Sequence, residues 1–249
     1  MRSVNRVVGA LSRRLDRPEW LAAVDATARL AQREAIGMSA VLAAVLHGEG
    51  TYVDVGANRG QVLREAVRIA PHGRHIAFEP IPSLAREVEL AFPDVDCRRK
   101  ALGAETAAAE FCHFRKLDGW SGLRRSPEIS DSEGDPEYIT VEVSTLDVEL
   151  AGIAPSVVKI DVEGAELAVL EGGRAILSEA RPIVIFEHFA SAAALYETDP
   201  GAAWDLLDGL GYEIFSIVGE GPFTKAAFVR GAGIVNWLAS PRVRATAPQ

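Results

Sequence analysis

Carboxylates stand at the ends of four predicted strands, and these are the residues of the sequence best suited to chemistry. They are Asp54, Glu79, Asp161 and Glu187. A carboxylate that closes a buried strand is costly unless it has a partner or a ligand. In an open α/β sheet, ligands bind beyond the carboxyl ends of the parallel strands. The four side chains therefore predict a ligand site along one edge of a sheet.

The first of these strands leads into a glycine loop. Residues 51–55 form a short apolar run with β-branched side chains, and residues 61–70 carry apolar side chains at helical spacing. Between them, Gly56 and Gly60 permit a tight turn that leaves bare backbone for a ligand. The free N–H groups of the helix start point at the same place. Glu79 ends the next strand and can accept hydrogen bonds from both hydroxyls of a ribose, so we expect a nucleoside-type cofactor.

The loop favours S-adenosylmethionine over a dinucleotide. A dinucleotide fold has three glycines, whereas Asn58 stands in place of the middle one. Asp54 would repel a pyrophosphate and suits an ammonium group, which S-adenosylmethionine carries beside its ribose. A purely structural strand–turn–helix is the other alternative. Cofactor contacts are expected from Asp54, Gly56, Asn58, Gly60, Glu79, Pro80, Ala101 and Leu102, the last two through backbone amides near an adenine edge.

A second group of residues is suited to an acceptor. Asp161, Glu187 and the adjacent His188 follow two later strands, and a hydroxyl acceptor needs a general base within hydrogen-bonding reach. His188 is the best candidate by residue type, because the ordinary pKa of histidine is near neutrality. The alternative, of equal weight, is that His188 only caps the strand or the next helix. Mg²⁺ bound by these three groups is an alternative that the spacing does not favour, so no metal site is predicted. Substrate contacts are expected from His113, Trp120 and Ser121, for which packing is the other interpretation.

Strand-like and helix-like segments alternate along residues 50–240, which indicates an α/β fold with a doubly wound, mostly parallel sheet. Residues 1–49 are predicted to form an N-terminal helical extension, in which residues 18–47 form two helices separated at Gly37, and residues 241–249 form a tail. A strand-rich insertion at about residues 104–150 is typical of a substrate-selecting region. The predicted strands of the main sheet are 51–55, 75–80, 95–102, 156–161, 182–187, 212–218 and 233–239, and those of the insertion are 110–114, 119–122 and 138–145. The last two strands of the main sheet can be antiparallel, because only a loop is expected between them.

Composition limits the classes of partner. The net charge of −9 argues against a nucleic-acid-binding protein, which needs a basic face. No apolar run is long enough to span a membrane, and the two cysteines, Cys97 and Cys112, are expected to be free thiols, so we expect a cytoplasmic protein. Residues 1–17 have a basic amphipathic pattern, which fits a packed terminal helix or a peripheral contact with an anionic membrane surface or an acidic protein.

Several segments together resemble the FkbM family of S-adenosylmethionine-dependent methyltransferases. They are residues 53–60 (VDVGANRG), 78–80 (FEP), 101–103 (ALG), 145–147 (TLD), 159–166 (KIDVEGAE) and 186–187 (FE). The resemblance covers roughly residues 50–240 and implies a class I methyltransferase fold, a seven-stranded Rossmann-like sheet with a reversed final hairpin. It also implies O-methylation of a hydroxyl on a sugar, a glycolipid or a polyketide-type natural product. Asp54, Gly56 and Glu79 would contact the cofactor, and Asp161 would lie where the methionine end of the cofactor meets the acceptor.

Two functions from other classes are alternatives. A methyltransferase fold can bind S-adenosylmethionine without turnover and serve as a scaffold in a biosynthetic complex. A dinucleotide-dependent oxidoreductase is the weaker alternative, because the glycine loop departs from the dinucleotide pattern at Asn58. The acceptor, the pathway and the oligomeric state are not readable from the sequence.

Overall fold

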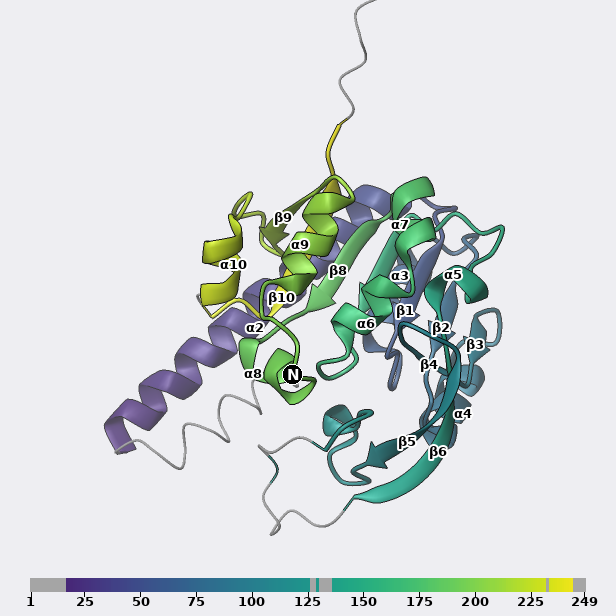
Figure 1. Cartoon of the computed structure of the whole chain (residues 1–249), viewed down its shortest axis with the longest axis horizontal. Coiled ribbons are helices and arrows are strands. Elements are labelled where there is room, and N and C mark those ends of the chain that lie inside the picture. The colour runs from purple at the N-terminus through teal and green to yellow at the C-terminus, as the bar shows by residue number, and fades with distance from the viewer. Residues whose placement is uncertain (1–16, 126–128, 130–135, 232, 244–249) are drawn as a thin grey trace, which may run out of the picture.

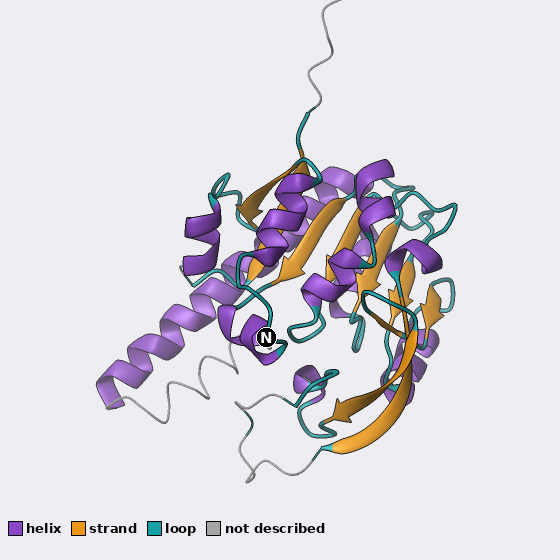
Figure 2. Cartoon of the chain, in the orientation of Figure 1, coloured by secondary structure: helices purple, strands orange, loops and turns teal. Residues whose placement is uncertain are grey.

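The computed structural model contains a seven-stranded sheet with helices on both faces (Figures 1 and 2). It describes residues 17–125, 129, 136–231 and 233–243. The strand order is β3-β2-β1-β7-β8-β10-β9, and β10 alone runs antiparallel to its neighbours. The strands are β1 (Tyr52–Val55), β2 (Ile76–Phe78), β3 (Asp96–Arg98), β7 (Val157–Ile160), β8 (Ile183–Glu187), β9 (Tyr212–Ser216) and β10 (Asn236–Pro241). The predicted seven-stranded, mostly parallel sheet with a reversed last pair is confirmed.

Two hydrophobic clusters cover the two faces of the sheet, because side chains alternate along each strand. On one face, Val53, Ile160 and Phe186 pack against the first helix group; on the other, Tyr52, Val157 and Ile185 pack against the second. The first group contains α5 (Leu146–Glu149), α6 (Glu166–Glu171), α7 (Arg174–Glu179), α9 (Ala202–Gly209) and α10 (Lys225–Arg230). The second group contains α2 (Arg17–Leu46), α3 (Gln61–Ile69) and α4 (Pro82–Ala91).

The N-terminal extension differs from its prediction. Residues 17–46 form one continuous helix, α2, whose first turns extend beyond the sheet (Figure 1). Gly37 does not break it. A Cβ atom at Gly37 would lie 2.5 Å from the carbonyl oxygen of Ile217, so glycine is needed there for close packing of the helix against the end of β9. The predicted basic pattern of residues 1–17 lies outside the described residues, except for Arg17.

The predicted strand at 95–102 is two strands in two sheets. Its first part is β3, and its second part, β4 (Ala101–Leu102), leaves the main sheet to pair with β6 (Glu137–Ser144). β6 also pairs with β5 (Ala107–His113), and this small sheet forms the insertion. The predicted strand at 119–122 is instead a 3₁₀ turn, η1 (Asp118–Trp120), followed by a single bridge from Gly122 to Cys112.

The C-terminal strands are antiparallel as predicted, but a helix and not only a loop connects them. The helix α10 lies between β9 and β10, and the returning strand β10 inserts between β8 and β9. The short helix α8 (Ala190–Leu195) after β8 was not predicted. Both cysteines are free, as expected. Within the described residues, no helix combines the length and the apolar character that a membrane span needs.

Candidate active site

The glycine loop after β1 closes against the end of β7. Gly56 has a left-handed φ of 80°, and a Cβ atom there would lie 2.0 Å from the carbonyl oxygen of Asp161. The backbone N–H groups of Gly56 and Ala57 both donate to the carbonyl of Phe78, at 3.0 Å each. Asn58 is also left-handed, with a φ of 50°. A side chain at Gly56 would therefore require the β1 and β7 ends to separate.

Glu79 is fixed to this loop by its two carboxylate oxygens. Its Oε2 accepts a hydrogen bond from the backbone N–H of Asn58 at 2.7 Å, and its Oε1 accepts one from Ile81 at 2.9 Å. The residue is only 4 % exposed. A buried carboxylate held by two backbone donors is preorganised, so its remaining lone pairs have a defined direction.

Glu79 lines a pocket that we call the Glu79 pocket. Its other walls include the loop residues Gly56 and Asn58, together with an apolar set formed by Phe78, Pro80, Ala101, Leu102 and Phe111. A lining of apolar side chains with a few polar groups suits a nucleoside. Gly60 is not among the lining residues of the described chain. It caps α3, and a Cβ atom there would lie 2.5 Å from the Phe92 ring, so we assign it a packing role.

Strand alternation places four charged side chains on the α2/α3 side of the sheet. Asp54, Lys159, Asp161 and Glu187 follow the same face as the buried residues Tyr52, Val157 and Ile185. Lys159 Nζ lies 3.2 Å from Asp54 Oδ1 and 3.4 Å from Asp161 Oδ2. Burial alone would lower the pKa of Lys159, but the two carboxylates raise it above its ordinary value. Lys159 is therefore a charged ammonium between two acidic strand ends.

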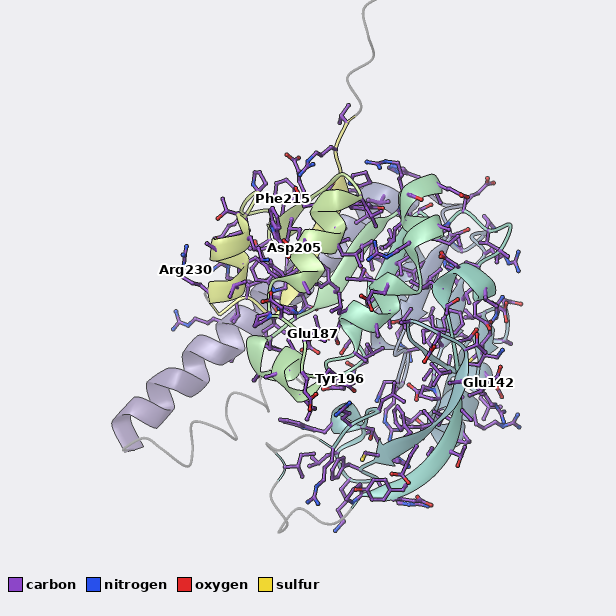
Figure 3. All side chains as sticks on the ribbon, viewed as in Figure 1. Glu142, Glu187, Tyr196, Asp205, Phe215 and Arg230 are labelled. Carbon is purple, nitrogen blue, oxygen red and sulfur yellow. The ribbon has the colours of Figure 1, made fainter. Side chains whose placement is uncertain are left out.

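These side chains line a second cavity, which we call the Glu187 cleft. Its floor contains Asp54, Lys159, Asp161, Glu163 and Glu187. Carboxylate oxygens of Asp161, Glu163 and Glu187 lie within 4.8 Å of one another. Such spacing is compatible with a divalent cation, but it is also common in acidic sites without one, and Mg²⁺ stays a disfavoured alternative. In the labelled side-chain view, Glu187 lies at the end of β8 (Figure 3).

One wall of the Glu187 cleft is formed by α2, which lies outside the segments that resemble a known family. Ala31, Glu34, Ala35, Met38 and Ser39 of this helix line the cleft. Glu34 is 6 % exposed, and its Oε1 accepts hydrogen bonds from the backbone N–H groups of Val235 at 3.0 Å and Asn236 at 3.3 Å. Its Oε2 accepts a third bond from the Asn236 side chain at 2.9 Å. Glu34 thus ties α2 to the start of β10.

The turn after β7 belongs to both cavities. Gly56, Asp161 and Glu163 line the Glu79 pocket and the Glu187 cleft alike. Glu163 has a left-handed φ of 60°, an uncommon conformation for a residue other than glycine. Glu166 stabilises this turn, since its Oε1 accepts from Val162 N at 3.2 Å and Gly164 N at 3.0 Å. Burial raises the pKa of Glu166 to about 7.

The structure places His188 away from both cavities, where its side chain cannot reach an acceptor bound in either of them. The prediction that His188 is the general base is therefore wrong. Alternation turns His188 to the opposite face from Glu187. Its Nε2–H donates to the carbonyl of Pro200 at 3.0 Å, and its ring stacks on Phe228 at 4.6 Å between centroids. Burial lowers the pKa of His188. Neither cavity has His188 among its lining residues in the described chain, and the alternative of a structural histidine fits.

The three predicted substrate residues of the insertion are separated. Trp120 lines the Glu187 cleft, whereas Ser121 lines the Glu79 pocket and its Oγ accepts from the backbone N–H of Phe114 at 3.0 Å. His113 is buried beside Asp118, 3.4 Å from it, and is absent from both sets of lining residues in the part of the chain described. Asp118 lines both cavities and also pairs with Arg59 of the glycine loop at 2.7 Å.

The sequence did not single out five residues that line or support the two cavities: Glu34, Asp118, Lys159, Glu163 and Glu166. Lys159, Glu163 and Glu166 carried a local signal, because they lie in the 159–166 segment of the family resemblance, and a lysine inside an apolar strand is unusual. Glu166 accepts its hydrogen bonds from the adjacent turn, whereas Glu34 and Asp118 depend on contacts between segments that are distant in sequence.

Comparison with known families decides the assignment. The model described as Methyltransferase FkbM domain matches residues 54–214. The chain belongs to the FkbM methyltransferase family. The matched part of this FkbM protein begins at Asp54, contains Glu79, Asp161 and Glu187, and leaves out α2.

Solved structures with a similar fold include three methyltransferases. A methyltransferase FkbM from Methylobacillus flagellatus aligns with 16 % identity and a TM-score of 0.48, over 77 % of this chain and 43 % of that one. A TehB-like S-adenosylmethionine-dependent methyltransferase from Corynebacterium glutamicum aligns with 11 % identity and a TM-score of 0.45, over 82 % and 85 % of the two chains. The plantazolicin methyltransferase BpumL in complex with SAH aligns with 10 % identity and a TM-score of 0.43, over 96 % of each chain. This chain thus spans less than half of the first structure. The comparison with curated proteins gave no match.

Proposed function

We propose that this protein transfers the methyl group of S-adenosylmethionine to a hydroxyl of a sugar, a glycolipid or a polyketide-type natural product. The observation that carries the proposal is the junction of the two cavities at Gly56, Asp161 and Glu163. A donor in the Glu79 pocket and an acceptor in the Glu187 cleft would meet at this junction. Positioning of this kind supplies much of the rate of a group transfer.

The residues of the Glu79 pocket fit S-adenosylmethionine. Glu79 is oriented by two backbone N–H groups and would accept hydrogen bonds from the ribose hydroxyls. Gly56 presents bare backbone to both cavities, and the carboxylates of Asp161, at the junction, and of Asp54, on the side of the Glu187 cleft, offer negative charge to the ammonium of the cofactor. When bound, the cofactor would supply a methyl group on a positively charged sulfur.

Glu187 is the carboxylate best placed to act as general base. It lines the Glu187 cleft but not the Glu79 pocket, whereas Asp161 lines both. A hydroxyl acceptor must lose a proton as it attacks, and a carboxylate within hydrogen-bonding reach can take that proton. We therefore assign the base to Glu187 and the junction to Asp161. Trp120 would provide an apolar surface for the acceptor.

Adjacent residues on opposite faces of β8 provide the test. Labelled S-adenosylmethionine is incubated with panels of glycosides, glycolipids and macrolide-type alcohols, and methyl transfer is measured for the wild type, Glu187→Gln and His188→Ala. We expect Glu187→Gln to lose about a hundredfold or more in turnover with cofactor affinity retained. His188→Ala should keep turnover and lose about 1 to 2 kcal/mol of unfolding free energy.

The other outcomes discriminate between functions. Cofactor binding with no methylation of any hydroxyl panel would favour the scaffold alternative. Binding of NAD(P) in place of S-adenosylmethionine would favour the oxidoreductase. Loss of turnover in His188→Ala but not in Glu187→Gln would remove Glu187 from the mechanism.

A further inference from the structure

Lys159 is a buried charge for which the proposed reaction has given no role. It lies on β7 directly opposite Asp54 of β1 in the parallel register, with its side chain 7 % exposed. The Asp54 side chain is 1 % exposed and that of Asp161 is 28 % exposed. Both carboxylates lie within reach of the same Nζ atom, at 3.2 and 3.4 Å. Lys159 therefore bridges two strands at the point where both cavities meet.

Other charged and titratable groups face this position. Tyr52 lies on the same face of β1, and burial, followed by the charge of Asp54, raises the pKa of its hydroxyl. Glu163 and Glu187 contribute further carboxylates close to Asp161. The same cleft is also lined by Glu34, Glu65 and Asp118 and by two further cations, Arg59 and Lys116. Carboxylates therefore outnumber cations around the bridge, and each carboxylate disfavours the ionised form of the others.

Two carboxylates in one poorly solvated site normally share a proton unless a cation lies between them. A buried ion pair contributes little net stability compared with apolar residues of similar volume. A lysine is therefore not required here for stability alone. The arrangement is explained if both carboxylates must be ionised before a positively charged ligand arrives.

We propose that Lys159 is a positioning residue that keeps Asp54 and Asp161 ionised, and in one orientation, for the ammonium end of S-adenosylmethionine. This inference rests on the proposed function, because it takes the ligand of the junction to be that cofactor. Lys159 acts through the two carboxylates. Its contribution is electrostatic and is not merely a pair of hydrogen bonds.

The test separates charge from hydrogen bonding. Lys159→Gln removes the charge but retains an N–H donor, whereas Lys159→Arg retains both the charge and the donors. Dissociation constants for S-adenosylmethionine and S-adenosylhomocysteine are measured by calorimetry at several values between about pH 5.5 and pH 7.5, where a shared carboxylate proton would titrate. Each variant is compared with the wild type at the same pH. This ratio cancels the titration of the ligand and of groups such as Glu166 that all the proteins share.

We expect the ratio for Lys159→Gln to depend on pH. Its affinity should be weakest relative to the wild type near pH 5.5 and should recover by about tenfold or more towards pH 7.5, as the shared proton is lost. The ratio for Lys159→Arg should stay within about twofold across the range. A purely structural role predicts the opposite for Lys159→Gln, a loss that is equal at every pH, and that result would overturn the proposal.

A second measurement covers the case in which Lys159→Gln fails to fold, as judged by thermal unfolding. Nitrogen-15 NMR of labelled lysine side chains in the ligand-free wild type follows the charge of Lys159 directly. The proposal requires Lys159 to stay protonated up to about pH 10, and loss of its proton below that value would overturn it. If the folded wild type binds neither S-adenosylmethionine nor S-adenosylhomocysteine, the proposed function fails instead. The two failures are thus distinguishable.

Discussion

The Glu79 pocket and the Glu187 cleft adjoin, yet they are built from different kinds of contact. The walls of the pocket come from the turns after β1, β2 and β7, from β4 and from the insertion, and backbone hydrogen bonds fix Glu79. The cleft is assembled from the ends of several strands, from η1 and from α2, which lies outside the family match. Side-chain carboxylates and one lysine form its floor. Backbone groups fix the carboxylate of the pocket, whereas charged side chains from distant segments meet in the cleft.

This difference predicts that the two sides of the site tolerate substitution differently. The cofactor side uses glycine conformation and backbone donors, which tolerate little change. The acceptor side can change through α2, whose described residues line the Glu187 cleft and not the Glu79 pocket. Substitutions on the two sides should therefore have separable effects.

The largest effect is expected at Gly56. Gly56→Ala forces a Cβ atom to within 2.0 Å of the Asp161 carbonyl oxygen, so we expect the affinity for S-adenosylmethionine to fall by about a thousandfold, or roughly 4 kcal/mol. Gly152→Ala is the matched control, because Gly152 has a φ of 74° with nothing within 4 Å of its added Cβ. It should cost about 1 kcal/mol of stability without changing affinity. Calorimetric titration measures the affinity of both variants for S-adenosylmethionine. An affinity of Gly56→Ala equal to that of Gly152→Ala would contradict the proposed contact between the glycine loop and the cofactor.

The turn shared by the two regions should give stability a pH dependence. The pKa of Glu166 is raised from 4.5 in the unfolded chain to about 7 in the fold, so folding favours its protonated form. Its stabilising contribution is complete below about pH 4.5 and is lost progressively as the pH rises to about 7. Glu166→Gln removes this titration but keeps an acceptor for Val162 and Gly164.

Relative to the wild type, the unfolding free energy of Glu166→Gln should therefore rise by roughly 3 kcal/mol between about pH 4.5 and pH 7. Urea unfolding at a series of pH values measures the difference. A constant difference across the range would show that Glu166 does not titrate there.

A smaller effect, confined to the cleft, is expected at Glu34. Glu34→Ala leaves the backbone N–H groups of Val235 and Asn236 without their acceptor and should cost about 2 kcal/mol of stability. Hydrogen exchange of α2 should accelerate, while the affinity for S-adenosylmethionine stays within about twofold, because Glu34 lines only the cleft. Glu34→Gln is the control, since it retains Oε1 as an acceptor and should lose less than half as much stability. A large loss of cofactor affinity in either variant would contradict the separation of the two regions.

The smallest effect is expected at the ion pair that connects the glycine loop to the insertion. Arg59 is about half exposed, so its 2.7 Å contact with Asp118 is screened by solvent. Asp118→Asn should reduce affinity for the cofactor by about threefold at low salt, and by less at high salt. Glu89 of α4 makes a comparable surface pair with Arg99, and Glu89→Gln should change nothing at the site. An effect of the same size in both variants would mean that the connection to the insertion is irrelevant.

Local pattern signals Gly56 and the carboxylates at strand ends, and the structure brings these residues to the two cavities: Glu79 to the pocket, and Asp54, Asp161 and Glu187 to the cleft. His188 was misassigned because the twofold alternation of side chains was not extended past Glu187. The contribution of α2 was not predictable, because the hydrogen bonds of Glu34 join residues about 200 positions apart. The sequence predicts a helix break at Gly37 because glycine has a low helix propensity. The close contact with Ile217, which explains the glycine, exists only in the folded chain.

The central claim is that the Glu79 pocket binds S-adenosylmethionine at its junction with the Glu187 cleft. Calorimetric titration of the wild type and Glu79→Ala with S-adenosylmethionine, with NAD(P) as the control ligand, tests it most directly. We predict a dissociation constant of the order of micromolar for S-adenosylmethionine in the wild type, a loss of about a hundredfold in Glu79→Ala, and no binding of NAD(P). Binding of NAD(P) with no uptake of S-adenosylmethionine would contradict the roles given to Asp54 and Glu79 and the reaction built on them.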